Sequence, residues 1–130
     1  MLRSADRELQ LCGMRAGDLQ VAWVPGSVEL PLVARCFARR DDIDAVLCLG
    51  LVLKGETTHD YWVAAGAVQG IMDASLETDT PILLGVLTCE TLQQARDRAL
   101  PLDEGGKEDK GRELARAAAD VLNAMDVARG

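Results

Sequence analysis

The sequence predicts an α/β protein in which helices cover both faces of a parallel β-sheet. Short runs of leucine and β-branched residues alternate with longer segments of helical periodicity, which is the pattern of βα units. Residues 44–53 and 81–88 are almost entirely apolar, as expected of strands that are buried on both faces. The 130 residues match the size of one compact domain, so we expect a single domain over residues 1–130.

Three strands and five helices are expected along the chain. A strand over residues 19–24 ends at Pro25-Gly26, and the two apolar strands that follow it should be central in the sheet. Ser27 can cap the second helix, and either Thr57 or Thr58 the third, because their hydroxyl groups can accept hydrogen bonds from free helical amides. The helices are expected over residues 3–12, 27–39, 57–75, 91–99 and 111–127.

The composition and charge exclude several classes of protein. Hydrophobic residues make up 48% of the chain and charged residues 27%, which is a globular composition. With 14 Lys and Arg against 21 Asp and Glu, the net charge is −7, so nucleic acid and anionic membranes are not expected partners. No apolar run reaches the roughly 18 residues of a membrane helix, and the amino end lacks an apolar signal core. We therefore expect a cytoplasmic protein.

The cysteines and tryptophans are expected to be structural. The chain has four cysteines, Cys12, Cys36, Cys48 and Cys89. They are too widely spaced for C-x-x-C zinc or redox pairs, and three of them lie in apolar stretches, so we expect buried, reduced thiols. Core packing is expected for Trp23, in a strand, and for Trp62, on a helix.

The first candidate binding turn, residues 24–29, leads from a strand into a helix. Ligands of parallel sheets bind beyond the carboxyl ends of the strands, and this turn lies there. It contains Ser27, Val28 and Glu29. Glu29 is either placed there by the favourable helix dipole or used to bind a ligand, and the sequence leaves both interpretations open.

The second turn, Lys54-Gly55-Glu56-Thr57-Thr58-His59, has the features of an anion site. Its glycine allows close approach of the backbone, two hydroxyl groups follow, and the amides of a new helix point beyond the strand. His59 is the only histidine of the chain and lies in the first helical turn. It is either a structural or exposed histidine, or a proton carrier that works near neutral pH.

The third turn follows residue 88 and opens a helix that carries Arg96 and Arg98. A polar loop over residues 103–111 comes next, and its Lys107 is expected to be solvated. Arg98 and Lys110 either form ordinary surface ion pairs or close together on a phosphate, one that a neighbouring subunit could hold.

Five segments, in order, resemble the 6,7-dimethyl-8-ribityllumazine synthase family. They are V-P-G-S-V-E-L-P (residues 24–31), L-G-L-V-L-K-G-E-T-T-H (49–59), T-P-I-L-L-G-V-L-T (80–88), Q-A-R-D-R-A (94–99) and E-D-K-G (108–111). The likeness covers nearly the whole chain. Five motifs at matching spacings are specific, whereas any one of them alone would not be.

The resemblance implies a flavodoxin-like subunit that catalyses the penultimate step of riboflavin synthesis. In that step 5-amino-6-(D-ribitylamino)uracil condenses with 3,4-dihydroxy-2-butanone 4-phosphate, with loss of water and phosphate and without a metal or organic cofactor. Such chemistry needs an anion cradle, a proton shuttle and a surface that positions a flat heterocycle. The resemblance also implies a homo-oligomer, a pentamer or a higher shell, with sites shared between neighbouring subunits.

Roles for particular residues follow from the same resemblance. His59 matches the proton-transferring histidine, Arg98 matches the phosphate-binding arginine, and Lys110 lies where the family has a basic residue. The backbone amides of Glu56 and Thr57 would face the phosphate. Contacts to the pyrimidine and the ribityl chain are implied for Ser27, Val28, Glu29, Leu51, Val52, Leu53 and, from an adjacent subunit, Leu84.

The sequence departs from the family pattern at its amino end. Family members begin with a strand and a loop with an aromatic ring that stacks on the heterocycle, whereas this sequence starts within the first helix. Leu84, too, is aliphatic where many members have an aromatic residue. We expect a sheet that lacks the N-terminal strand, with two unpaired strand edges facing the gap. Either Met1 is an internal start and the protein is longer, which we favour, or a partner segment fills the gap, or the gene is decaying.

Two further functions compete with the enzyme. One is a catalytically impaired member of the same fold, either a binder of flavin-like ligands or an assembly subunit, because the stacking aromatics are missing. The other is a thiol-dependent enzyme that uses Cys48 or Cys89. No second base lies near either cysteine in the sequence, which disfavours it.

Overall fold

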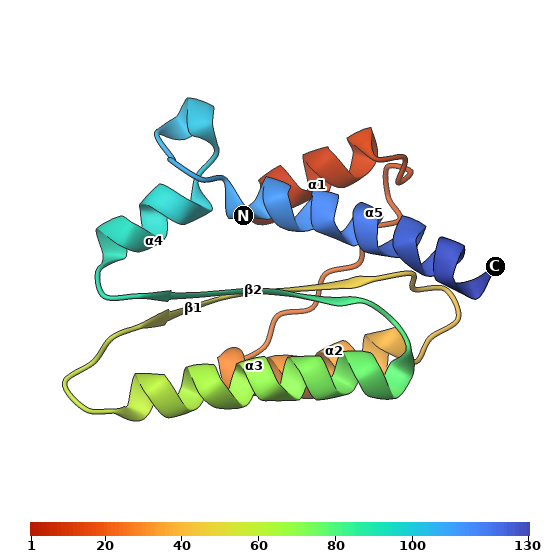
Figure 1. The fold of residues 1–130 in the computed structure, drawn as a ribbon. Helices are drawn as coiled ribbons and strands as arrows, with labels where there is room; N and C mark the ends of the chain where they lie inside the picture. Colours follow the sequence, from red (N-terminus) through yellow and green to blue (C-terminus); the bar gives the residue numbers. More distant parts are fainter.

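Two parallel strands form the middle layer of the molecule, between two layers of helices (Figure 1). The computed structural model describes residues 1–130. One face of the sheet is covered by α1 (Leu2–Leu11), α4 (Leu92–Ala99) and α5 (Lys110–Arg129). The other face is covered by η1 (Ser27–Glu29), α2 (Leu30–Ala38) and α3 (His59–Thr78). The strands are β1 (Val46–Leu53) and β2 (Ile82–Cys89), and the short helix η2 (Leu102–Glu104) lies between α4 and α5.

This arrangement confirms the predicted three-layer α/β fold with a parallel sheet. The bounds of all five predicted helices and of the two apolar strands are within three residues of those observed. Thr91 caps α4 as its hydroxyl accepts from the Gln94 amide at 3.1 Å. Ser27 makes no capping hydrogen bond, so its predicted role as a helix cap is wrong. No helix combines the length and the hydropathy that crossing a membrane requires.

The register of the two strands places their carboxyl ends at the same edge of the sheet. Val46 pairs with Ile82 at one end of the ladder, and Leu53 pairs with Cys89 at the other. The crossover helix α3 returns the chain from the end of β1 to the start of β2 (Figure 1). The turns that follow β1 and β2 therefore lie at one end of the molecule, as ligand sites of parallel sheets do.

The strand predicted over residues 19–24 is absent. Residues 19–25 take part in none of the backbone hydrogen bonds of the structure, and the sheet contains only β1 and β2. An extended segment becomes a strand only when its backbone hydrogen-bonds to a neighbouring strand. Residues 19–24 have no such neighbour, because no strand bridges them to β1. The prediction of a strand here is therefore wrong, because the segment has no hydrogen-bonding partner. The outer edge of β1 is unpaired, as expected for a sheet without the N-terminal strand.

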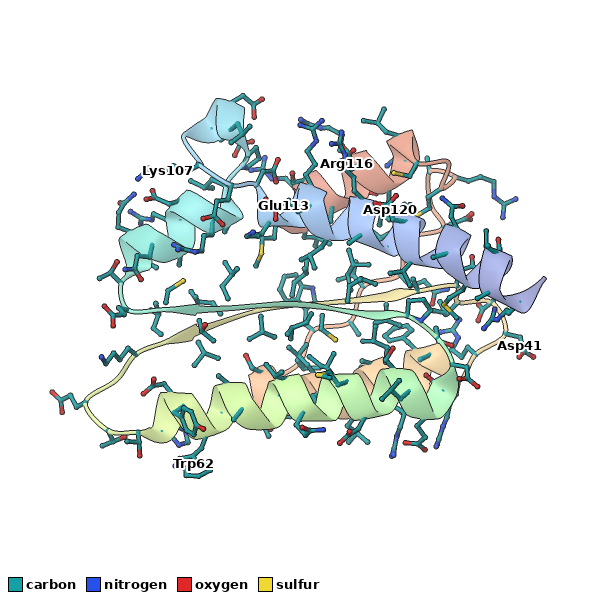
Figure 2. The ribbon with its side chains drawn as sticks, viewed as in Figure 1. Asp41, Trp62, Lys107, Glu113, Arg116 and Asp120 are labelled. Carbon is teal, nitrogen blue, oxygen red and sulfur yellow. The ribbon has the colours of Figure 1, made fainter.

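Both tryptophans lie on the surface, so the prediction of core packing is wrong. Trp23, on the unpaired segment, is 86% exposed, and Trp62, in the first turns of α3, is 67% exposed. Figure 2 shows Trp62 on the side of α3 that faces away from the strands. An indole can be buried only where a second layer covers it, and neither position has such a layer.

The prediction of buried thiols holds for two of the four cysteines. Cys48 and Cys89 are buried, whereas Cys12 and Cys36 are exposed. Cys48 packs in the core between the sheet and the α2–α3 layer, and burial raises the pKa of its thiol to about 11. A thiol with such a pKa is almost wholly protonated near neutral pH and is a poor nucleophile, which weighs against the thiol-dependent enzyme.

Helix α1 is fixed to α5 by a buried carboxylate. Glu8 is only 5% exposed and accepts from Arg112 Nε at 3.1 Å and from Arg116 Nε. The Arg116 guanidinium, with Arg112 beside it, holds the pKa of Glu8 below its ordinary value of 4.5. One turn earlier, the Ser4 hydroxyl donates to Asp109, the residue that caps α5. The position of the start of α5 thus depends on α1.

We expect the outer edge of β1 to exchange its amide hydrogens quickly. The Val46 amide donates to the Pro81 carbonyl and the Lys54 amide to the Cys89 carbonyl, so the amides of the even-numbered residues between them also point toward β2. The odd-numbered ones direct their amides to the open edge. Hydrogen exchange followed by NMR should be faster by about tenfold or more at Leu47, Leu49, Leu51 and Leu53 than at Cys48, Gly50 and Val52. Equal protection of both sets would show that another strand covers this edge.

We expect Glu8→Gln to lower the Tm by a few degrees at pH 7. The folded-state pKa of Glu8 is depressed, so its contribution is present above about pH 4.5 and is lost as the pH falls through the folded value. The difference in Tm should therefore shrink in acid, as measured by calorimetry at several pH values. Asp6→Asn is the control. It removes the same charge from α1, but Asp6 accepts a hydrogen bond from Gln10 and pairs with no arginine. A Tm difference that is independent of pH would contradict this account.

Candidate functional site

The turn between β1 and α3 presents free backbone amides at one end of the sheet. The Gly55 amide donates to Asp60 Oδ1 at 3.4 Å, and the His59 amide donates to Thr57 Oγ1 at 3.3 Å. The amides of residues 56, 57 and 58 have no acceptor within the chain. They stand at the start of the 20-residue helix α3, whose dipole makes this end electropositive. The turn can therefore accept an anion without first breaking internal hydrogen bonds.

His59 is the first residue of α3, and its side chain is exposed. It directly follows the three free amides. An imidazole in this position can reach a molecule bound at the turn, and no other part of the fold covers it. The structure thus agrees with an accessible proton carrier and excludes a histidine packed in the core.

Ser27, Val28 and Glu29 form η1, which lies beside β1. A Cβ atom built on Gly50 would lie 3.1 Å from Ser27 Oγ, so the glycine in β1 lets this turn approach the strand closely. Val28 is exposed, and the Glu29 carboxylate makes no hydrogen bond or ion pair within the chain. A free carboxylate beside a strand end can accept hydrogen bonds from hydroxyl groups of a ligand.

The carboxyl end of β1 is open on one side. Leu51 and Leu53 are exposed, and Val52 between them is partly buried. Lys54 Nζ lies 3.4 Å from Glu90 Oε1, so an ion pair joins the ends of β1 and β2. Apolar side chains and unpaired backbone groups are therefore available next to the turn before α3.

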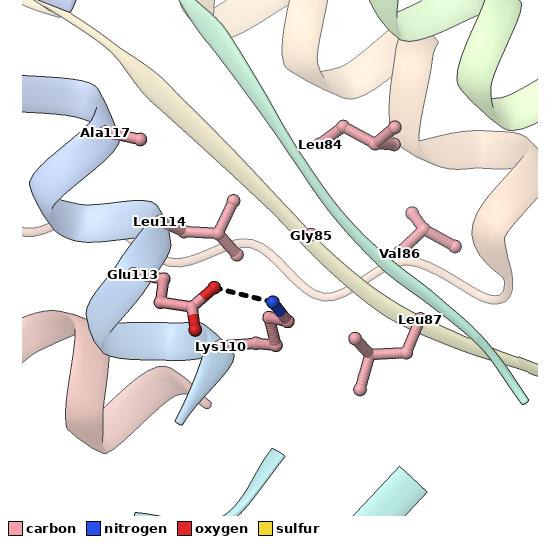
Figure 3. Close-up of a pocket in the computed structure, with 8 residues that line it drawn as sticks. All are labelled: Leu84, Gly85, Val86, Leu87, Lys110, Glu113, Leu114 and Ala117. Atoms are coloured by element: carbon pink, nitrogen blue, oxygen red, sulfur yellow. Dashed lines mark hydrogen bonds and ion pairs between the residues drawn. The ribbon is translucent and has the colours of Figure 1, made fainter. Parts of the chain in front are cut away.

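A second group of predicted residues lies on β2, α4 and α5. Leu84 and Lys110 both line a cavity of about 430 Å³ between β2 and the start of α5. Figure 3 shows Leu84 on the side of β2 opposite Leu114, and Lys110 turned toward Glu113. Lys110 Nζ lies 2.6 Å from Glu113 Oε2. Glu113, followed by Glu108, raises the pKa of Lys110, so this lysine stays charged.

Arg98 and Lys110 are connected through Glu108. Arg98 Nε lies 3.8 Å from Glu108 Oε1, and Lys110 Nζ lies 3.2 Å from Glu108 Oε2. Glu108 belongs to the E-D-K-G segment of the family resemblance, but no role was predicted for it or for Glu113. The sequence signals for a contact with Lys110 were the E-D-K-G segment for Glu108 and a spacing of three residues for Glu113, and such spacings are common on protein surfaces. Lys107, expected to be solvated, is largely exposed and pairs with Asp97.

The predicted site residues thus fall into two groups in one chain. The first combines η1, the end of β1 and the turn before α3, and the second combines β2, α4 and α5. The two strands are paired, but no side-chain hydrogen bond or ion pair joins a predicted site residue of one group to a predicted site residue of the other. The first group contains Ser27, Val28, Glu29, Leu51, Val52, Leu53, Glu56, Thr57 and His59, and the second contains Leu84, Arg98 and Lys110.

Comparison with known proteins agrees with the motifs and the fold. The family model described as 6,7-dimethyl-8-ribityllumazine synthase matches residues 1–126. A relative of that name from Thermus thermophilus is 46% identical over 110 residues, which is 84% of this chain and 67% of the relative.

Two further relatives carry the same name. The protein from Salinibacter ruber is 42% identical over 131 aligned residues, which cover all of this chain and 81% of the relative. The protein from Protochlamydia amoebophila is 37% identical over 127 residues, which is 97% of this chain and 71% of the relative. Both the family model and these relatives extend across the two groups of site residues. The chain therefore belongs to the 6,7-dimethyl-8-ribityllumazine synthase family.

Proposed function

We propose that the chain condenses 5-amino-6-(D-ribitylamino)uracil with 3,4-dihydroxy-2-butanone 4-phosphate, at a site made by two copies. As a member of its family it is a transferase of riboflavin biosynthesis, a 6,7-dimethyl-8-ribityllumazine synthase. The observation that carries the proposal is the turn before α3, where three unpaired amides precede an exposed histidine. A cytoplasmic location stays a prediction.

In this proposal the turn before α3 binds the phosphate-bearing substrate, and His59 moves protons. The free amides of Glu56, Thr57 and Thr58 donate to phosphate oxygens. The amine of the uracil must lose a proton as it attacks the carbonyl group, and the departing water must gain one. An imidazole beside the anion can perform both transfers.

The uracil substrate lies against η1 and the end of β1 in this proposal. The free carboxylate of Glu29 accepts hydrogen bonds from ribityl hydroxyl groups, and Ser27 offers a further hydroxyl. The backbone and side chains of residues 51–53 position the pyrimidine. Holding both substrates in one orientation supplies much of the rate, because the reaction then avoids the entropy cost of an encounter.

The separation of the two groups supports a site shared between subunits. Arg98 and Lys110 are the cations expected at the phosphate, yet in one chain they lie on the α4–α5 side of the sheet. Leu84 lies on β2, whose outer edge has no partner strand. A second copy that brings its own Arg98, Lys110 and Leu84 to the His59 turn completes the site. A cyclic homo-oligomer, such as a pentamer or a shell of pentamers, meets this requirement in every subunit.

His59→Ala should reduce the rate of lumazine formation by about 10²-fold or more, because a general acid–base catalyst is lost. Product is followed by its absorbance, and size-exclusion chromatography with light scattering monitors assembly. The fold of the subunit should be unchanged, since the side chain is exposed in it, and a loss of assembly would be counted separately from a loss of catalysis. A variant with full activity would refute the role of His59, and a folded, oligomeric wild type without product would refute the proposed function.

Mixing two inactive variants should restore activity if the site is shared. In mixed rings of His59→Ala and Arg98→Ala chains, about a quarter of the interfaces combine an intact histidine with an intact arginine. Refolding equal amounts together should therefore recover about a quarter of the wild-type rate, whereas each variant alone stays inactive. Failure to recover activity in rings shown by native mass spectrometry to be mixed would place both residues in one subunit's site.

One observation favours the non-catalytic alternative. Position 84 is a leucine, so the second group lacks an aromatic ring that could stack on a heterocycle; the exposed rings nearest to His59 in the sequence are Tyr61 and Trp62, on α3 itself. Such stacking contributes about 1–3 kcal/mol per base in nucleic-acid complexes. A riboflavin-binding assembly subunit would bind riboflavin without forming lumazine, and a fluorescence titration alongside the activity assay separates the two functions.

A further inference from the structure

Arg98 and Lys110, the two cations of the second group, both form ion pairs with one carboxylate of the same chain. Glu108 lies between Arg98 Nε, at 3.8 Å, and Lys110 Nζ, at 3.2 Å, and each cation contacts a different oxygen of the carboxylate. Arg98 is at the end of α4 and Lys110 at the start of α5. The carboxylate thus bridges the two helices at the point where an oxyanion would contact both cations.

The backbone around Glu108 is held in place from both sides. The Glu108 amide donates to the Asp97 carbonyl at 3.1 Å, and the Lys107 amide donates to the same oxygen at 2.6 Å. The next residue, Asp109, is only 7% exposed, adopts φ of 48°, and accepts from the Arg112 amide at 3.3 Å. Lys107 is thus fixed to α4 and Asp109 to α5. The backbone of Glu108, between them, is held in a defined position next to Arg98 and Lys110.

Carboxylate and phosphate oxygens compete for the same donors on arginine and lysine. We infer that Glu108 is an internal counterion of the phosphate site, which the phosphate group of the substrate must displace and which returns when inorganic phosphate leaves. The inference rests on the proposed function for one point, that Arg98 and Lys110 bind the phosphate of the substrate. It assigns to Glu108 the control of phosphate affinity.

The exposure of the cluster makes such an exchange feasible. All three side chains are between a third and two fifths exposed, so water takes part in solvating them. Ion pairs of this kind are weak, and displacing one corresponds to about a two- to fivefold change in a binding constant. Glu108 therefore weakens phosphate binding without blocking it. A site that must release phosphate in each catalytic cycle benefits from a carboxylate that takes the place of the departing anion.

The test is the affinity of Glu108→Gln for inorganic phosphate. Phosphorus NMR line broadening or calorimetry on the intact assembled protein should show a dissociation constant about two- to fivefold lower than in the wild type. Glu104→Gln is the matched control: it removes the same charge from the same loop, but Glu104 pairs with the exposed Arg3. Its phosphate affinity should equal that of the wild type.

A second variant excludes a general effect of net charge or of folding. Adding Arg98→Ala to Glu108→Gln removes one of the two cations, so the gain in affinity should be lost. Circular dichroism verifies that all variants are folded, and Glu108→Ala replaces Glu108→Gln if the latter is unstable. An unchanged dissociation constant in Glu108→Gln, or an equal gain in Glu104→Gln, would overturn the inference.

The phosphate titration is independent of turnover, so the two hypotheses can fail separately. If Glu108→Gln binds phosphate more tightly but the protein forms no lumazine, Glu108 still stands as the counterion of a phosphate site at Arg98 and Lys110, and the proposed function falls. If the protein is active, Glu108→Gln should also lower the KM for the butanone phosphate and increase inhibition by inorganic phosphate. An active enzyme in which neither quantity changes would overturn the inference and leave the function in place.

Discussion

The parallel pairing of β1 with β2 is the constraint on which the rest of the structure depends. The ladder runs without interruption from Val46–Ile82 to Leu53–Cys89, so both strands end at the same edge. A parallel pair requires a crossover, and α3 fills that role while covering one face of the sheet. The start of α3 is thereby placed directly beyond β1. The free amides and His59 lie at the strand ends because the topology of the sheet puts them there.

On the other face, close packing of α5 against β2 places the cationic group. A Cβ atom built on Gly85 would lie 2.5 Å from Leu114 and 2.8 Å from the Cys48 carbonyl, so only glycine allows this approach. The start of α5 is then held by α1, through Ser4 and Asp109, and through Glu8 and its two arginines. Lys110 is thus positioned by contacts that reach across most of the sequence.

An acidic protein that is proposed to bind phosphate needs electropositive groups at the binding site itself. The net charge of −7 opposes the approach of an anion at long range. At the turn before α3 the attraction comes from backbone amides, which carry no net charge and need no counterion. At the second group it comes from Arg98 and Lys110, and there Glu108 and Glu113 balance the cations. The two halves of the proposed site therefore attract phosphate by different physical means.

The helices, the two apolar strands and the turn that carries His59 could be predicted from the sequence, because periodicity, capping residues and glycine act within a few residues. It could not determine whether residues 19–24 form a strand, since that depends on a neighbouring ladder, nor that Trp23 and Trp62 lie on the surface. Two features are seen only in the folded chain: Glu108 bridges Arg98 and Lys110, and the site residues divide into two groups. Those features join residues from different helices, and their contacts follow from packing, on which local sequence patterns carry little information.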